Sequence, residues 1–305
     1  MAVVPNLFIV GAPRCGTSAM FGLIGQHQNI AVSHPKEPYY FCTDFREESD
    51  RHHGRPMRFP IRTEAEYLAV FKDRSRRFVA EATPAYLYSK AAAANIHAYS
   101  PDAKIIALVR NPIDVLHSLH AKFLTYGHEN LQDFRQALQA EPERQTGQRL
   151  PRGLFWPSSL YYSRWVQFGE QIERYRRVFP AGQVKVVVHE DFRRDNIATY
   201  ADILAFLGLD LFQPEIQRRN EHAVVRSAAL ARALTIVGDL PLMHLVPAEL
   251  RRRIRSRVAK VNRRPVTREP MDPGLRRELI ARFKPDVEHV SRVLDRDLVS
   301  LWGYA

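Results

Sequence analysis

Short apolar runs alternate along the chain with segments in which apolar residues recur every three or four positions. The runs are typical of buried strands and comprise Leu7–Val10, Phe78–Ala80, Lys104–Val109 and Val184–Val188, with Phe78–Ala80 the weakest. The repeats are typical of helices with one buried face and cover Thr17 to about Gln26, Ile113–Phe123, Tyr161–Phe179, Ile197–Leu207 and Pro273–Leu294. Asn111-Pro112 indicates a helix start, with asparagine as N-cap and proline in the first turn.

Strands that alternate with helices predict an α/β fold in which a parallel sheet is flanked by helices on both faces. For 305 residues we expect a single domain, with a core at 6–210 and a basic, mainly helical C-terminal extension at 220–305. Two stretches interrupt the alternation: the polar stretch 125–157 and the strongly basic stretch 220–270. Both are candidates for excursions on the substrate side of the sheet, and the basic stretch has the alternative of a solvated helix face.

The charge of the chain suits an anionic partner. The net charge is +12, and only eight of the 45 basic residues are lysines. Arginine is the better bidentate partner for phosphate and sulfate, so a nucleotide, a nucleic acid, a membrane surface or an acidic glycan would fit. A GC-rich genome would also enrich arginine, and charge alone does not choose among these partners.

Other sequence features narrow the class of protein. No apolar stretch approaches the ~20 residues that span a membrane, and we find no signal peptide, so we expect a cytoplasmic protein. Two cysteines, Cys15 and Cys42, make neither a disulfide framework nor a zinc site, so we expect reduced thiols.

A glycine-containing loop follows the first strand. Its sequence, Gly11-Ala12-Pro13-Arg14-Cys15-Gly16-Thr17-Ser18, has four residues between two glycines and ends in two hydroxyl side chains. Such a strand-to-helix loop can direct several backbone N–H groups at one anion, and the helix dipole adds to the attraction. The sheet is therefore predicted to be P-loop-like, with an ordinary structural turn as the alternative.

The predicted anion pocket differs from that of a nucleoside triphosphatase. Those enzymes have Lys followed by Ser or Thr after the second glycine, whereas Thr17 stands here and the cation comes earlier, at Arg14. They often keep an Asp at a neighbouring strand end to hold magnesium, whereas Arg110 follows Lys104–Val109. The sequence thus favours a metal-free pocket with two phosphate positions.

Several blocks, taken in order, resemble sulfotransferases that use 3′-phosphoadenosine 5′-phosphosulfate (PAPS), especially the bacterial and heparan-sulfate-type branch. The resemblance covers roughly residues 6–210 and is thin from 220 onward. The similar blocks are Pro13–Ser18 (the 5′-phosphosulfate loop), Lys36–Phe41, Glu81–Tyr86, Val109–Pro112 with Ser118 (the 3′-phosphate motif), and Val188–Phe192 with Phe206–Leu209. Neither the first loop nor the 3′-phosphate motif is specific for this family by itself. The two are specific when they occur together, each at its strand end.

The resemblance implies transfer of a sulfuryl group from PAPS to a hydroxyl acceptor, with adenosine 3′,5′-bisphosphate (PAP) as product and no metal. Arg14 would stabilise charge at the sulfuryl group and the leaving oxygen, and Glu37 would act as general base. The residues expected to bind the donor are Arg14, Cys15, Gly16, Thr17, Ser18, Arg110, Ser118 and, as a weaker candidate, Arg226.

Two positions depart from the family pattern. The family often has Lys where this chain has Arg14, although bacterial members also use Arg there; arginine acts by charge and hydrogen bonds, since it does not deprotonate. Ala82 stands where the heparan-sulfate-type block has Lys, which removes a cation near the acceptor and argues against a heparan-like substrate.

Each candidate residue has an alternative. Arg110 could pair with a structural carboxylate such as Asp114, and Ser118 could be an inert helix position. Glu81 and His34 are rival bases to Glu37. Aromatic residues that could line the acceptor cleft, or simply pack, are Tyr39, Tyr40, Tyr86 and Trp156.

Rival functions remain at this stage. A small-molecule kinase with a degenerate phosphate loop would need magnesium and ATP, and a non-catalytic nucleotide or nucleic-acid binding protein would draw on the basic run Arg251–Arg268. No aromatic-interleaved basic platform for nucleic acid is present, so we expect no nucleic-acid partner. A carboxylate as general base favours an acceptor with an alkyl hydroxyl, on a carbohydrate or a secondary metabolite. The sequence names neither the acceptor nor the oligomeric state.

Overall fold

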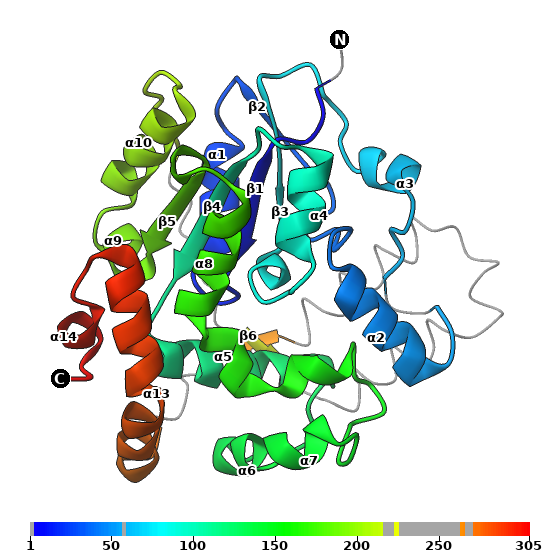
Figure 1. Cartoon of the computed structure of the whole chain (residues 1–305), viewed down its shortest axis with the longest axis vertical. Coiled ribbons are helices and arrows are strands. Elements are labelled where there is room, and N and C mark those ends of the chain that lie inside the picture. Colours follow the sequence, from blue (N-terminus) through cyan, green and yellow to red (C-terminus); the bar gives the residue numbers. More distant parts are fainter. Residues whose placement is uncertain (1–2, 57–58, 216–222, 226–262, 266–270) are drawn as a thin grey trace.

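Five parallel strands form the central sheet of the protein. The computed structural model describes residues 3–56, 59–215, 223–225, 263–265 and 271–305. The strand order is β2-β3-β1-β4-β5, and every neighbouring pair is parallel (Figure 1). The strands are β1 Leu7–Gly11, β2 Ile30–Val32, β3 Phe78–Ala82, β4 Lys104–Val109 and β5 Val184–Val188. The predicted α/β fold is confirmed, and four strands lie where the apolar runs predict them.

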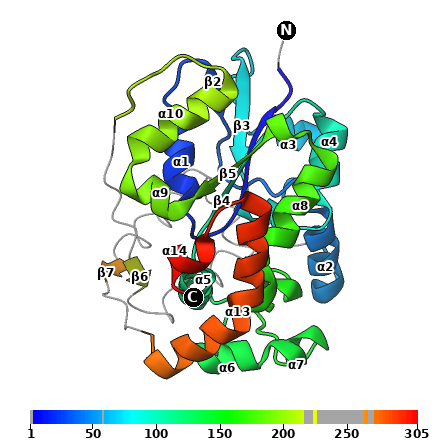
Figure 2. The same cartoon turned by 60° about the vertical axis from the view of Figure 1, so that its left-hand side comes forward.

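Helices cover both faces of this sheet. Helices α1 (Thr17–Ile24) and α10 (Asn196–Leu207) lie on one face, and α4 (Ala92–Tyr99) and α8 (Phe168–Val178) lie on the other (Figure 2). Helix α13 (Pro273–Leu294) packs against α8 and α5 (Pro112–Tyr126). The shorter elements are α2 Thr43–His53, α3 Glu64–Leu68, α6 Phe134–Gln139, α7 Glu141–Gln145, α9 His189–Arg194, α14 Leu298–Trp302, and 3-10 turns at Pro84–Tyr86, Pro157–Leu160, Tyr162–Val166 and Ala181–Gln183.

The C-terminal helix follows its apolar repeat. Helix α13 has the predicted bounds, and its buried residues are the predicted set Leu275, Leu279, Phe283, Val287 and Val290. The described part of 220–305 also contains a short antiparallel pair, β6 (Ala223–Val225) and β7 (Arg263–Pro265), which the expectation of a mainly helical extension did not include. Arg226 and the basic residues 251–255 lie outside the described residues.

The aromatic repeat at Tyr161–Phe179 does not form one continuous helix. It begins as a 3-10 turn at Tyr162–Val166, and α8 starts only at Phe168. Gln167 separates the two because its backbone, at φ −74° and ψ 57°, is not helical. The repeat still marks burial correctly, since most of its aromatic side chains belong to the core.

The carboxyl ends of β1, β3 and β4 meet at one edge of the sheet, where the register pairs Ile9 with Ala82 and Gly11 with Ala107. Leu87, just after the 3-10 turn Pro84–Tyr86, donates its N–H to the carbonyl of Val10 at 2.6 Å. Gly11 permits this approach, because a Cβ there would lie 2.3 Å from the Cβ of Leu87. The loop after β1, the turn after β3 and helix α5 after β4 therefore surround the same place.

Two further features concern the cysteines and the helices. Cys15 and Cys42 are both buried and form no disulfide. Within the part of the chain that the structure describes, no helix is long and apolar enough to cross a membrane.

Candidate active site

The loop after β1 presents the N-terminus of α1. Gly16 is the N-cap in the left-handed region, at φ 94°, and no side chain caps the helix, so the N–H groups of the first turn remain for an anion. A Cβ at Gly16 would meet the rings of His189 and Phe192 at 3.3 Å, so α9 closes the back of the loop. His189 contacts the carbonyl of Cys15 through Nδ1 at 3.0 Å.

Cys15 faces inward from this loop. Its N–H donates to the carbonyl of Ala12 at 3.4 Å, and its thiol lies in the core. Burial raises the pKa of the Cys15 thiol far above its ordinary value, so it stays protonated. The thiol thus serves packing, whereas the role predicted for Cys15 uses its backbone N–H, so Cys15 stays a candidate for anion contacts beside Gly16, Thr17 and Ser18.

Arg14 and Ser118 lie in direct contact. The Nε of Arg14 donates to the Oγ of Ser118 at 2.7 Å, which joins the loop after β1 to helix α5. Ser118 is buried, and Arg14 lines a cavity beside the loop. The sequence predicts both residues at the donor site, and the structure adds that they touch. This bond uses only the Nε–H of Arg14, so it does not consume the N–H groups of the two terminal nitrogens.

Arg110 follows β4 and lies behind the same loop. One terminal nitrogen donates to the carbonyl of Arg14 at 3.3 Å, and the other lies 3.4 Å from the Asp114 carboxylate. The pairing with Asp114 that the sequence leaves open as an alternative is thus present, but both contacts are long. A half-buried guanidinium with two long contacts retains capacity for an anionic ligand.

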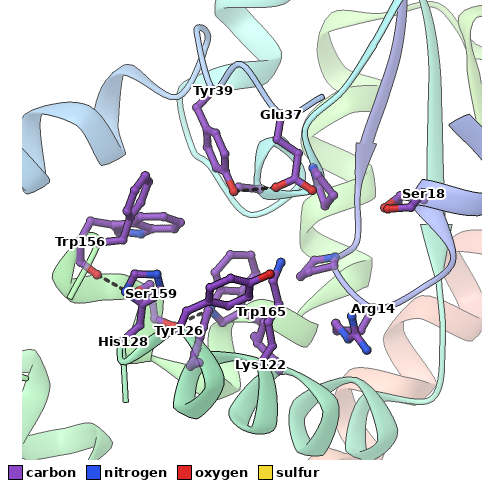
Figure 3. A pocket seen from close by; sticks show the side chains of 17 residues that line it. Arg14, Ser18, Glu37, Tyr39, Lys122, Tyr126, His128, Trp156, Ser159 and Trp165 are labelled. Atoms are coloured by element: carbon purple, nitrogen blue, oxygen red, sulfur yellow. Dashed lines mark hydrogen bonds between the residues drawn. The ribbon is translucent and has the colours of Figure 1, made fainter. Parts of the chain in front are cut away.

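Glu37 projects into the cavity from the segment between β2 and α2. Its carboxylate accepts a hydrogen bond from Tyr39 Oη at 3.0 Å (Figure 3) and another from Lys36 Nζ at 3.1 Å. Lys36 Nζ also donates to Ser18 Oγ at 3.2 Å, which links this carboxylate to the first turn of α1. Burial alone would raise the pKa of Glu37, but Lys122, Lys36 and the two hydrogen bonds outweigh it and hold the pKa below its ordinary value.

The cavity joins the two predicted catalytic residues. Its volume is about 330 Å³. Figure 3 shows Glu37 and Tyr39 facing Lys122 and Tyr126 across it, with Arg14 towards one end and Trp156 towards the other. The lining residues are Pro13, Arg14, Thr17, Ser18, Glu37, Tyr39, Pro84, Ala85, Leu119, Lys122, Phe123, Tyr126, His128, Phe155, Trp156, Ser159 and Trp165.

Several sequence candidates lie outside this cavity. Tyr40 stacks on Tyr67 with ring centroids 4.5 Å apart and borders a different surface hollow. Tyr86 is fully buried, and His34 is exposed and not part of the lining. Of the four aromatic residues proposed for the acceptor cleft, Tyr39 and Trp156 line the cavity.

Sequence reasoning missed Lys122, one of the two cations beside Glu37; the other, Lys36, begins the predicted block Lys36–Phe41. Lys122 lies four residues after Ser118 on α5, and residues at this spacing share a helix face, so the predicted helix could have pointed to it. Lys36 directly precedes Glu37, but only the fold shows that its Nζ reaches Ser18. Among the residues described, no group of three or more His, Cys, Asp or Glu side chains could hold a metal ion.

Glu81, the rival base, is a fully buried carboxyl on β3. It accepts hydrogen bonds from the hydroxyls of Tyr67, Thr83 and Tyr86 at 2.8, 3.0 and 3.0 Å. Burial outweighs these bonds and raises its pKa to about 7. Glu81 does not line the cavity, so its titration concerns stability rather than proton transfer from an acceptor.

This raised pKa predicts a pH-dependent stability. Its contribution is fully present below the unfolded value of 4.5 and is lost as pH rises through about 7, on the order of 3 kcal/mol in all. Glu81→Gln should remove this dependence. Urea unfolding from pH 4.5 to 9 of both proteins measures it. Parallel curves for the two proteins would show that Glu81 is not titrating with a raised pKa.

Comparisons with known proteins agree with this geometry. A profile of the sulfotransferase family matches residues 5–214. The chain is 25% identical over 213 residues to the bifunctional heparan sulfate N-deacetylase/N-sulfotransferase 1 of Xenopus laevis, a match covering 67% of this chain and 22% of that protein. It is 25% identical over 209 residues to heparan sulfate glucosamine 3-O-sulfotransferase 6 of Homo sapiens, covering 67% of this chain and 52% of that protein.

A solved structure is similar over nearly the whole chain. The sulfotransferase from Alicyclobacillus acidocaldarius superposes with a TM-score of 0.70 at 29% identity, and the match covers 98% of both chains. The curated relatives, by contrast, are matched over only a fifth to a half of their own length. Because the family profile matches well over half of the residues of this chain, the chain belongs to the sulfotransferase family.

Proposed function

We propose that the protein transfers a sulfuryl group from PAPS to a hydroxyl acceptor. The observation that carries the proposal is a single cavity that joins the phosphate loop, through Arg14 and Ser18, to an ionised carboxylate, Glu37. A kinase with a degenerate loop has no support from the family match. Membership of the sulfotransferase family supports the reaction class, whereas the donor and the roles of individual residues are our inference.

The residues around the loop fit a donor with two anionic groups. The first-turn N–H groups of α1, with the hydroxyls of Thr17 and Ser18, would hold the 5′-phosphosulfate. Arg110 and Ser118 would hold the 3′-phosphate, since both lie beside the loop and Arg110 makes only long contacts. Arg226, the weaker candidate, lies outside the described residues.

The transfer needs a base, a stabilised sulfuryl group and a leaving group. Glu37 accepts the proton of the acceptor hydroxyl while the hydroxyl oxygen forms its bond to sulfur. The bond between sulfur and the bridging phosphate oxygen breaks, and the electron pair leaves on PAP. Arg14 stabilises the charge on the sulfuryl oxygens and the bridging oxygen, so that positioning and electrostatics supply the rate.

Arg110→Ala tests the donor site. We expect PAP, without metal, to bind the unaltered protein and to lose about 10- to 100-fold in affinity in the variant, because a charge-assisted hydrogen bond to phosphate is lost. Isothermal titration calorimetry measures both. Arg177→Ala, which removes an exposed guanidinium on α8, controls for the change in net charge and should bind PAP normally.

The same titration separates the rival functions. ATP with magnesium serves as the competing ligand. A clear preference for magnesium-ATP, or no binding of PAP to the unaltered protein, would overturn the sulfotransferase proposal in favour of a kinase.

The proposal specifies only the reacting group of the acceptor, a hydroxyl. The relatives are named for heparan sulfate, but Ala82 lacks the lysine of that branch, and a carbohydrate or a secondary metabolite both carry alkyl hydroxyls. A carboxylate base suits a hydroxyl that does not ionise by itself. The shape of the cavity narrows the acceptor further.

A further inference from the structure

The cavity has a polar end and an aromatic end. Arg14 and Ser18 lie at the polar end beside the phosphate loop, whereas Trp156 lies at the other end (Figure 3). Ring contacts connect the aromatic wall, with centroids 5.9 Å apart for Tyr39 and Phe155, 5.3 Å for Phe155 and Trp156, and 6.2 Å for Trp156 and Trp165. These rings come from three separate segments and form one continuous apolar surface.

Three polar side-chain atoms of the aromatic wall are hydrogen-bonded within the protein, whereas Trp156 Nε1 is buried without a partner among the described residues. Trp165 Nε1 donates to the carbonyl of Ser159 at 2.8 Å, and Ser159 Oγ donates to the carbonyl of Trp156 at 2.6 Å. His128 Nδ1 lies 2.8 Å from the carbonyl of Gly153. A ligand with many hydroxyls would give up its water here without gaining equivalent partners, which disfavours a sugar.

The charges of the lining are few and lie near the reacting group. Among the described lining residues, the side chains with a full charge are Arg14, Glu37 and Lys122. Arg14 serves the sulfuryl group, and Lys122 is the largest counter-charge acting on Glu37. No row of cations extends from these residues along the described lining, so an acidic glycan chain would find little compensation for its carboxylates and sulfates.

The size of the cavity also points to a compact ligand. A cavity of about 150 Å³ holds one benzene ring. The present volume of about 330 Å³ is roughly twice that, enough for a body of about two rings. Burial of such a body against the aromatic wall would supply the binding energy that holds its hydroxyl at Glu37.

We propose that the acceptor is a compact, uncharged alcohol with an apolar ring body, bound against the aromatic wall with its hydroxyl directed to Glu37. This inference rests on the proposed function. It departs from what the names of the glycan-modifying relatives suggest, because the described lining offers apolar rings where a glycan would need polar and cationic partners.

The first test compares two acceptor classes on the PAP-loaded protein. Isothermal titration calorimetry uses 2-naphthalenemethanol and cyclohexylmethanol against N-acetylglucosamine and a heparosan oligosaccharide. Mass spectrometry of reactions with PAPS then detects the sulfate esters. We expect binding and sulfation of the ring alcohols, with at least a 100-fold preference in kcat/KM over the sugars. Equal or better binding and sulfation of the sugars would overturn the inference, as would no binding of either ring alcohol.

Variants of Phe155 locate the binding surface. Phe155→Ala should weaken ring-alcohol binding about tenfold or more, whereas Phe155→Leu, which keeps apolar bulk, should stay within about threefold. Phe212→Ala removes a ring that packs on His27, away from the cavity, and should change nothing. PAP affinity confirms that each variant is folded. An unchanged ring-alcohol affinity in Phe155→Ala would contradict the proposed surface.

The two proposals fail in different ways. Loss of PAP binding in the unaltered protein would overturn the donor assignment, and the ring-alcohol titrations can still be run on the protein alone to judge the cavity. Normal PAP binding with a preference for sugars would overturn only the acceptor class and leave the sulfotransferase proposal standing.

Discussion

Glu37→Gln is expected to lower kcat by about 10²- to 10⁴-fold, the range typical for loss of a general base. Glutamine keeps the size of the side chain and can still accept a hydrogen bond from Tyr39, but it cannot take the proton of the acceptor hydroxyl. PAP affinity should change little, because the carboxylate reaches the phosphate loop only through Lys36. Steady-state kinetics with PAPS and a competent acceptor, beside calorimetry with PAP, measure the two effects separately.

A matched control and a pH profile sharpen this prediction. Glu47→Gln makes the same chemical change at an exposed position on α2, outside the cavity, and should leave kcat unaltered. The pKa of Glu37 lies below 4.5, so the base is ionised above that value and its activity is lost only as pH falls through the lowered pKa. The profile of kcat/KM should therefore show no acid limb near pH 6.5, the ordinary pKa of a histidine side chain. A limb there would reassign the base.

The fold could be predicted wherever apolar residues keep one period over a whole element. Helix α13 and strand β4 have the predicted bounds because their buried positions are evenly spaced or contiguous. Strand β5 also has its predicted bounds, although Lys185 and Val186 are only partly buried. Strand β2 has three residues, of which only Ile30 is fully buried, too short a run for periodicity to detect. Helix α2 could not be predicted for another reason. Of its 11 residues only Phe45 and Ser49 are buried, so the helix has no apolar repeat that periodicity can detect.

The candidate site could be predicted where function follows a strand, and not where distant segments converge. Arg14 and Arg110 directly follow β1 and β4, and the register of a parallel sheet brings such residues together. The aromatic wall combines Tyr39 with Phe155, Trp156 and Trp165, more than a hundred residues later, and no local pattern encodes that meeting. Arg14 and Glu37 have positive φ angles, 66° and 65°. These angles orient both side chains in ways that cannot be predicted from residue type.

The aromatic wall and the loop after β1 also differ in the contacts that fix their conformation. Rings that pack on one another, such as Phe45 on Trp156 at 4.8 Å, fix the wall by shape. The loop depends instead on single polar contacts, from His189 to Cys15 and from Arg14 to Ser118. Substitutions in the wall should therefore act mainly on acceptor KM, whereas substitutions in the loop should act on the chemical step or on donor binding.

Arg14→Ala is the strongest test of the loop. We expect kcat to fall by about 10²- to 10³-fold, the range typical for loss of one preorganised hydrogen-bond donor that stabilises charge in the transition state. PAP affinity should fall less than tenfold, because PAP lacks the sulfuryl group. Arg14→Lys should recover part of kcat, since it restores the charge and can share a proton with the leaving oxygen. Ser118→Ala removes the partner of Arg14 Nε together with a proposed contact to the 3′-phosphate, so we expect weaker PAP binding and a loss in kcat well below that of Arg14→Ala. If instead Arg14→Ala weakened PAP binding as much as it lowered kcat, and Arg14→Lys recovered neither, Arg14 would be a residue that shapes the loop, and the stabilising charge would have to come from Lys36 or Lys122.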